Sequence, residues 1–288
     1  MDLLNAAYLL LIVIGISAQG VIKKGYNNKS EGKGVFTFSS VTVLTACIFF
    51  VIKSGFNLPL GWEMLPYALG FAISYCLSAV FGFLAIKEGP LSLTSLATSY
   101  SLIIPTFWGL IFDGDEAGVW LYLGLLLLFV SILLINAKKK EGEGKITVKW
   151  LIYALISLVG NGACSTIQPM QSRAFGGAYD STFMVIALLV VFLVLASFAL
   201  FNERGEIVPS LKCGAPFMVL CGAANGMVNL LVMIASATVN NSVMFPIISA
   251  GGIVLTWLVS VFLYKEKLEK RQNIGMLLGV ISIIFLNL

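Results

Sequence analysis

The sequence contains no histidine, which removes a large group of enzyme and metal-site chemistries at once. Zinc sites with histidine ligands, serine–histidine triads and histidine-ligated haem all need an imidazole ring. Charged residues are scarce too, at 11% of the 288 residues, whereas soluble domains contain roughly 25%. Hydrophobic residues make up 59% of the chain. This composition excludes an ordinary soluble domain and indicates a helical membrane protein.

Cysteine and net charge add little functional signal. The five cysteines form no CxxC pair, and most lie in apolar runs, where cysteine is typically a small buried residue. The formal net charge is only +4, and the basic residues lie between the apolar runs rather than in a nucleic-acid-binding surface. We therefore predict no metal, no cofactor and no nucleic-acid partner.

Apolar runs of about 20 residues follow one another along the chain, separated by short polar breaks. We predict ten transmembrane helices, at about residues 3–22, 35–53, 64–86, 91–112, 118–137, 149–172, 181–202, 215–236, 242–264 and 273–288. A basic loop at 138–148 leaves five helices on each side. The sequence thus predicts an all-α membrane protein with two halves, residues 1–137 and 149–288.

The ends of the two halves match each other. When the chain is shifted by 151 residues, GLLLLFVSILLIN (124–136) lies over GMLLGVISIIFLN (275–287), with 6 of 13 positions identical. Ser131 then meets Ser282, and Asp115 meets the acidic residue before the last span. A repeat of five helices must lie in the membrane in opposite orientations in its two copies. We therefore predict two inverted five-helix repeats.

The basic residues support this inverted arrangement. Of the 18 Lys and Arg residues, sixteen lie in the odd-numbered loops, which follow spans one, three, five, seven and nine. Lys53 and Arg173 are the two on the other side. By the positive-inside rule, the odd-numbered loops are cytoplasmic in a plasma or inner membrane, and both termini are outside.

Two segments resemble EamA-like members of the drug/metabolite transporter superfamily. AIKEGPLSLTSLATSYSLIIPTFWGLIFDGDE (85–116) looks like their third-to-fourth-helix segment, and residues 236–288 look like the matching part of the second repeat. The resemblance implies a ten-helix carrier whose cavity lies between helices one to four and six to nine, with helices five and ten peripheral. Many such proteins have cytoplasmic termini, whereas the charge count of this chain favours termini outside.

Polar side chains recur at helical spacing in several predicted spans and predict the wall of a solute cavity. An unpaired amide in an apolar medium costs several kcal/mol, so amides carry more weight than single hydroxyls, which also help helices to pack. Hydrogen bonds between helices are the alternative explanation for the amides. The residues predicted to bind solute are Gln168, Asn161, Gln171, Asn225, Asn229, Gln19, Tyr8, Tyr75, Ser78, Thr98, Ser99, Tyr100 and Trp108.

No Asp, Glu, Lys or Arg lies in the middle of a predicted span. An intramembrane ionisable residue is the usual proton relay, and a membrane-embedded enzyme needs paired acids, histidine or a metal cluster. We therefore predict that the protein is not an enzyme. We expect a secondary transporter that moves a small polar, neutral or zwitterionic metabolite by alternating access. The alternatives are an exporter of organic cations or drugs and a non-transporting receptor or channel.

The last predicted span carries Gly275 and Gly279 at GxxxG spacing, which is typical of close helix contacts. Packing inside the protomer and contact with a second copy both explain this spacing. We predict a monomer, or a homodimer formed through these two glycines. The other expected partners are the small-molecule solute and the lipid bilayer.

Overall fold

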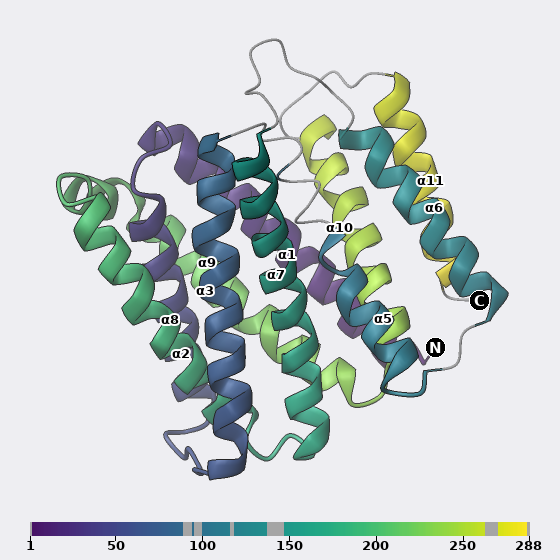
Figure 1. Cartoon of the computed structure of the whole chain (residues 1–288), viewed down its shortest axis with the longest axis horizontal. Helices are drawn as coiled ribbons and strands as arrows, with labels where there is room; N and C mark the ends of the chain where they lie inside the picture. Colours follow the sequence, from purple (N-terminus) through teal and green to yellow (C-terminus); the bar gives the residue numbers. More distant parts are fainter. Residues whose placement is uncertain are drawn as a thin grey trace. The chain divides into compact units, whose positions relative to one another are not determined.

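The computed structural model describes residues 2–88, 94, 100–115, 118–136, 147–262 and 270–286. In this described part the regular structure is α-helical apart from the short 3-10 helix η1 (Trp62–Met64), and it contains no strand (Figure 1). The α-helices are α1 (Leu3–Ser30), α2 (Val35–Lys53), α3 (Leu65–Glu88), α5 (Ile103–Ile111), α6 (Val119–Asn136), α7 (Val148–Ala174), α8 (Asp180–Asn202), α9 (Ile207–Ser236), α10 (Asn241–Phe262) and α11 (Lys270–Leu286).

Six helical segments of the described chain are long and apolar enough to cross a membrane. They are α1, α2, η1 together with α3, α7, α8 and α9. Shorter apolar stretches lie on α6 (Val119–Ser131) and α11 (Asn273–Ser282). Large apolar side chains such as Leu126 and Leu277 are exposed on these two helices, as lipid-facing residues are. The chain is therefore an all-α, multi-pass membrane protein, which confirms the prediction at this level.

Two helices are longer than the predicted spans. α1 continues to Ser30 rather than ending near residue 22, so Lys23, Lys24 and Lys29 lie on the helix and not in a loop. α9 begins at Ile207 rather than near residue 215. Hydropathy locates only the apolar part of a helix, whereas polar residues such as lysine can continue the helix beyond it. The hydropathy pattern therefore did not detect the polar ends of these two helices.

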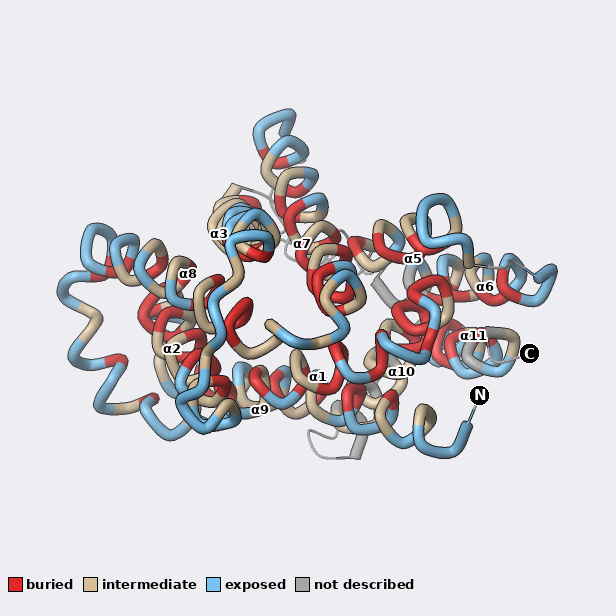
Figure 2. The backbone as a smooth tube through the Cα atoms, turned by 90° about the horizontal axis from the view of Figure 1, so that it is seen from below, coloured by how far each residue is buried: buried red, intermediate tan, exposed pale blue. Residues whose placement is uncertain are grey.

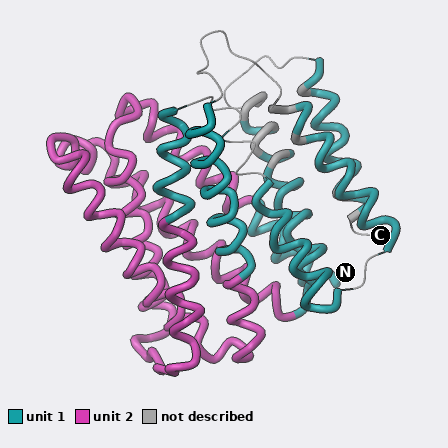
Figure 3. Tube along the Cα trace, viewed as in Figure 1, with its two compact units in different colours: residues 1–13, 77–166, 238–288 teal, residues 14–76, 167–237 magenta. Residues whose placement is uncertain are grey.

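The helices are grouped into two compact units, which Figure 3 shows in different colours. Unit 1 comprises residues 1–13, 77–166 and 238–288, and unit 2 comprises residues 14–76 and 167–237. Each unit therefore contains segments from both halves of the sequence. The boundary between the units falls inside α1, α3 and α7.

In unit 2, α2 packs against both α8 and α9. Figure 2 shows buried residues gathered where these helices meet. Tyr26, Phe38 and Met218 belong to one buried apolar cluster of this unit. The close approach of α2 to α9 requires a glycine at 222, because a Cβ atom there would lie 2.5 Å from the backbone oxygen of Thr42.

A carboxylate from the α8–α9 connection holds the start of α2. Glu203, which is 7% exposed, accepts hydrogen bonds from the backbone N–H groups of Phe36 and Thr37, both at 2.8 Å. It also accepts one from the Thr37 hydroxyl at 2.9 Å, while Glu206 accepts one from the N–H of Gly34 at 3.1 Å. The first N–H groups of a helix lack partners inside the helix and attract negative charge. Glu203 therefore fixes α2 to the end of α8.

In unit 1, α6 packs along α11, and α10 packs against both α5 and α11 (Figure 1). The hydroxyl of Ser131 on α6 donates a hydrogen bond of 2.6 Å to the carbonyl of Gly275. A Cβ atom at Gly279 would lie 2.9 Å from the same hydroxyl oxygen. Both glycines thus serve contact with α6 inside the protomer, which was one of the two explanations for their spacing. Contact with a second copy stays a prediction.

Acidic residues also hold the start of a helix in unit 1. Asp115 accepts a hydrogen bond from the backbone N–H of Ser242 at 3.0 Å. The amide of Asn241 donates to Asp113 at 2.8 Å. The first turn of α10 is therefore capped from the loop that follows α5, by the same electrostatic principle as α2.

Candidate functional site

The predicted solute-binding residues fall into three groups. Unit 2 contains Gln19, Tyr75, Gln168, Gln171, Asn225 and Asn229. Unit 1 contains Tyr8, Ser78, Tyr100, Trp108 and Asn161. Thr98 and Ser99 lie outside the described residues.

Four amide side chains of unit 2 form one hydrogen-bonded series, which we call the amide ladder: Gln19, Asn225, Asn229 and Gln168. Asn225 Nδ2 donates to Gln19 Oε1 at 3.2 Å. Asn229 Nδ2 donates to the backbone oxygen of Asn225 at 2.9 Å and to Asn225 Oδ1 at 3.1 Å. Gln168 Nε2 donates to the backbone oxygen of Asn229 at 2.8 Å. The amide ladder thus joins α1, α9 and α7.

Helical spacing and small residues position the amide ladder. Asn225 and Asn229 are four residues apart, so they lie one above the other on the same side of α9. Gly15 lets α1 approach α9 closely, because a Cβ atom at this position would lie 2.5 Å from a methyl carbon of Val228. Gln19, one turn further along α1, then reaches Asn225 while its own Nε2 donates to the Gly15 backbone oxygen at 3.4 Å.

The amide ladder is largely shielded from the surroundings. Gln19 and Gln168 are 8% and 4% exposed, and Asn225 and Asn229 are half-buried. Amides so placed need hydrogen-bond partners, and the ladder supplies them. Hydrogen bonding between helices, the alternative explanation for these amides, is therefore observed. Solute binding by the same residues stays a prediction.

Gln171 lies one helical turn beyond Gln168, on the same side of α7. Its side chain is fully buried, and neither its Nε2 nor its Oε1 atom has a hydrogen-bond partner among the described residues. Buried amides without partners are rare in proteins, because the free energy cost is of the order of 1–3 kcal/mol. An ordered water or a bound polar group is what usually satisfies such a side chain.

Two charged residues beside the α7 end of the amide ladder lie at helix ends. Nε of Arg173, at the end of α7, donates a hydrogen bond of 2.7 Å to the backbone oxygen of Ser236 at the end of α9. The hydroxyl of Ser172 donates to Asp180 at 3.1 Å, where α8 begins. The ladder itself consists of neutral amides alone. It offers hydrogen bonds and brings no fixed charge of its own.

The polar residues of unit 1 form separate pairs. Asn161 Nδ2 donates to the hydroxyl of Ser101, and the Ser157 hydroxyl donates to the backbone oxygen of Ser78 at 3.0 Å. The sequence prediction grouped Asn161 with Gln168, but the structure pairs it with Ser101 in the other unit. Tyr8 is half-buried on α1.

The predicted aromatic residues make ordinary ring contacts. Tyr100 stacks on Phe129, with ring centroids 5.2 Å apart, and Trp108 packs on Phe112 at 4.3 Å. Tyr75 in unit 2 lies 6.1 Å from Phe71. These contacts account for the rings as packing residues, and a role for them in solute binding stays a prediction.

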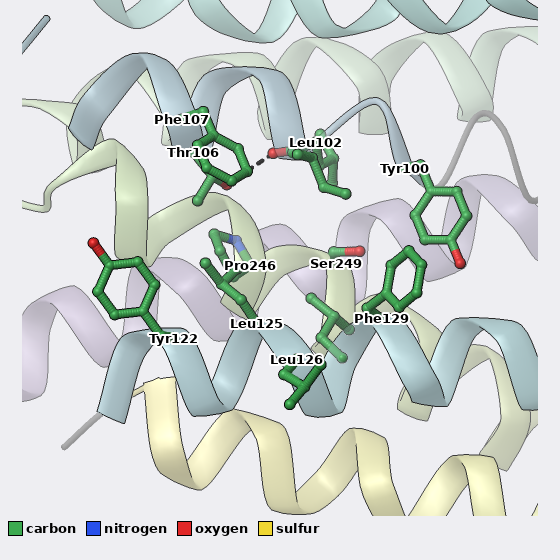
Figure 4. Close-up of a pocket in the computed structure, with 12 residues that line it drawn as sticks. Tyr100, Leu102, Thr106, Phe107, Tyr122, Leu125, Leu126, Phe129, Pro246 and Ser249 are labelled. Carbon is green, nitrogen blue, oxygen red and sulfur yellow. Dashed lines mark hydrogen bonds between the residues drawn. The ribbon is translucent and has the colours of Figure 1, made fainter. Parts of the chain in front are cut away.

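Unit 1 also contains a pocket of about 280 Å³ between α5, α6 and α10 (Figure 4). Apolar side chains such as Leu125, Phe129 and Pro246 form most of its lining. The hydroxyl of Thr106 is bonded at 2.8 Å to the backbone oxygen of Leu102. A pocket with so few free polar groups suits an apolar group rather than a small polar solute. We therefore place the candidate solute site at the amide ladder and Gln171.

Comparison with known proteins adds the fold alone. No family model matches the chain, and no curated protein matches it. Among solved structures, the chain is similar to a crystal structure of a protein that is 12% identical, with a TM-score of 0.77. The match covers 98% of this chain and 96% of the other chain.

Proposed function

We propose that this protein is a secondary transporter that moves a small polar, neutral or zwitterionic metabolite across a cell membrane by alternating access. The observation that carries the proposal is the amide ladder together with the buried amide of Gln171, which has no hydrogen-bond partner among the described residues. Burying amides among membrane-spanning helices costs free energy, so five buried amides are not expected in helices that only anchor a protein in the membrane.

The proposed architecture is a carrier of the EamA-like drug/metabolite transporter type, with ten spans in two inverted repeats. The ten apolar runs, the match of residues 124–136 with 275–287 and the uneven charge of the loops support it. The side-by-side packing of α6 and α11 fits as well, because these helices contain the matching segments. We propose that the odd-numbered loops are cytoplasmic and that both termini lie outside.

In the proposed mechanism the solute exchanges hydrogen bonds with the amide ladder. Each hydrogen bond of the ladder joins two groups on different helical turns or different helices. A solute that takes the place of one partner can pair the amide that this partner leaves, so no buried amide stays unpaired. The described middle parts of the spanning helices contain no Asp or Glu. The proposal therefore includes no carboxylate proton relay, and rocking of the repeats exposes the site to each side in turn.

Uptake and counterflow in liposomes test the proposal. Purified protein is reconstituted and assayed with amino acids, nucleobases, sugars, vitamins and organic cations, with protein-free liposomes as the control. We expect counterflow of at least one polar solute. Binding of a solute without any flux would favour a receptor, and absence of flux across the whole panel contradicts the transporter. A cytoplasm-only reporter fused to the C-terminus tests the orientation, and its activity there would contradict termini outside.

A further inference from the structure

The amides at the α7 end of the ladder can be oriented in only one way. Gln168 Nε2 faces the backbone oxygen of Asn229, and Asn229 Nδ2 faces the backbone oxygen of Asn225. A backbone oxygen only accepts hydrogen bonds, so each side chain must present its NH₂ group there. Turning either amide over would bring two oxygen atoms together at hydrogen-bond distance. The two backbone oxygens therefore decide which atoms of the side chains are left over.

The atoms left over are oxygens. Gln168 Oε1 and Asn229 Oδ1 accept no hydrogen bond from any residue that the structure describes. Neither atom belongs to the fully enclosed unpaired side-chain atoms of the described chain. Asn229 uses both of its N–H groups within the ladder, and Gln168 uses one of two. Acceptor capacity at this end thus exceeds donor capacity, with four lone pairs against one N–H group.

We infer that the amide ladder recognises a primary ammonium group of the solute, through Gln168 Oε1 and Asn229 Oδ1. This inference rests on the proposed transport function and names the chemical class of its substrate. A primary ammonium group presents three donors and no acceptor, which complements two free amide oxygens. Hydrogen bonds from a charged donor are stronger than those between neutral groups.

The surroundings of the two oxygens favour an ammonium group over an anion. An anionic group would face lone pairs, and the basic side chain at the end of α7, Arg173, donates its Nε hydrogen bond to the backbone oxygen of Ser236. Gln171, whose fully buried amide has no hydrogen-bond partner among the described residues, lies one turn beyond Gln168.

Methylation of the amine separates hydrogen bonding from charge. The purified full-length protein is titrated calorimetrically with glycine against N,N,N-trimethylglycine, and with ethanolamine against choline. The members of each pair have the same charge, but the trimethylated member has no N–H donor. We expect the primary amine of at least one pair to bind about tenfold more tightly or better than its trimethylated counterpart. Equal or tighter binding of the trimethylated members, or no binding by either pair, overturns the inference.

Variants locate the recognition in the ladder. Gln168→Met and Asn229→Leu remove one free oxygen each, and Asn202→Leu is the matched control, because the Asn202 amide lies exposed on α8 and bonds to its own helix. We expect the preference for the primary amine to fall to about onefold in both ladder variants and to persist in the control. A ratio of affinities is insensitive to a general loss of stability. An unchanged ratio in both folded variants contradicts the assignment.

Flux and binding together distinguish failure of this inference from failure of the transport proposal. Exchange of solutes that have no N–H or O–H donor, with no preference within the amine pairs, overturns ammonium recognition and leaves the carrier intact. Amine binding with a clear preference but no flux of any solute supports the recognition site and contradicts transport.

Discussion

In unit 1, two hydroxyls on apolar helices each donate to one backbone oxygen of a neighbouring helix: Ser131 to Gly275, and Ser157 to Ser78. In unit 2, four amides run in series, and the series ends with two oxygens that no described residue uses. The first arrangement holds one helix against another. The second also holds helices together, but it keeps hydrogen-bonding capacity for a ligand. The presence of polar residues in a membrane helix is therefore less informative than whether their hydrogen bonds are complete.

Breaking the middle of the amide ladder should have the largest effect. Asn225→Leu removes the group that donates to Gln19 Oε1 and the side-chain oxygen that accepts from Asn229 Nδ2. It leaves buried amide atoms unpaired, at a cost of roughly 1–3 kcal/mol each. We expect counterflow in liposomes to fall about 100-fold or more, with a lower thermal unfolding temperature. Asn202→Leu serves as the control, and counterflow within about twofold of the wild type in the Asn225 variant would contradict the role of the ladder.

The buried cap of α2 should come next, through stability rather than transport. Glu203→Gln removes the negative charge from the start of α2 and replaces one of the two oxygens that accept the three hydrogen bonds. We therefore expect the free energy of unfolding to fall by about 2 kcal/mol. Glu31→Gln is the matched control, because Glu31 is exposed and lies 4.0 Å from Lys33 in a surface pair. Unfolding in detergent with increasing denaturant measures both, and equal stability of the two variants would refute the cap.

Opening a closed pair in unit 1 should have a smaller effect. Ser131→Ala removes the hydrogen bond to Gly275, and we expect the free energy of unfolding to fall by about 1 kcal/mol while solute flux stays at the wild-type level. Ser197→Ala is the control, because its exposed hydroxyl bonds only to its own helix. A loss of flux in the Ser131 variant without loss of stability would erase the distinction between the two units.

The cap of α10 should have the smallest effect. Asp115→Asn keeps one oxygen that accepts from Ser242 and loses only the charge, so the free energy of unfolding should fall by about 0.5–1 kcal/mol. Denaturant unfolding of this variant and of Glu203→Gln compares the two losses in the free energy of unfolding. A larger loss for Asp115→Asn than for Glu203→Gln would show that the buried carboxylate with three bonds is not the stronger cap.

The sequence predicted the all-α, multi-pass membrane class, because a bilayer requires long apolar runs and few other structures contain them. It missed the last turns of α1 and the first turns of α9, where polar residues continue a helix that hydropathy no longer detects. The cap of α2 by Glu203 could not be predicted from the sequence either. A carboxylate at the end of one span gives no sign of which helix start, 167 residues away in the chain, it will meet.

The site was predicted in part. The amides stood out because they are costly in an apolar setting, and four of them do form one series. Their pairing did not follow from spacing, since Gln19 and Asn225 are 206 residues apart. Spacing gave no partner for Asn161 either, since Asn161 shares a helix face with Gln168 but bonds to Ser101 in unit 1. A helical pattern gives the side on which a residue lies and leaves its partner unspecified.

Counterflow by liposomes containing Gln168→Leu or Asn229→Leu tests the central claim most directly. Wild-type protein and Ser131→Ala are measured beside them, with any polar solute that the wild type exchanges. We predict that both ladder variants are expressed and folded but lose counterflow by at least about tenfold, while Ser131→Ala retains it. Wild-type counterflow in both ladder variants would contradict the proposal that the amide ladder binds the transported solute.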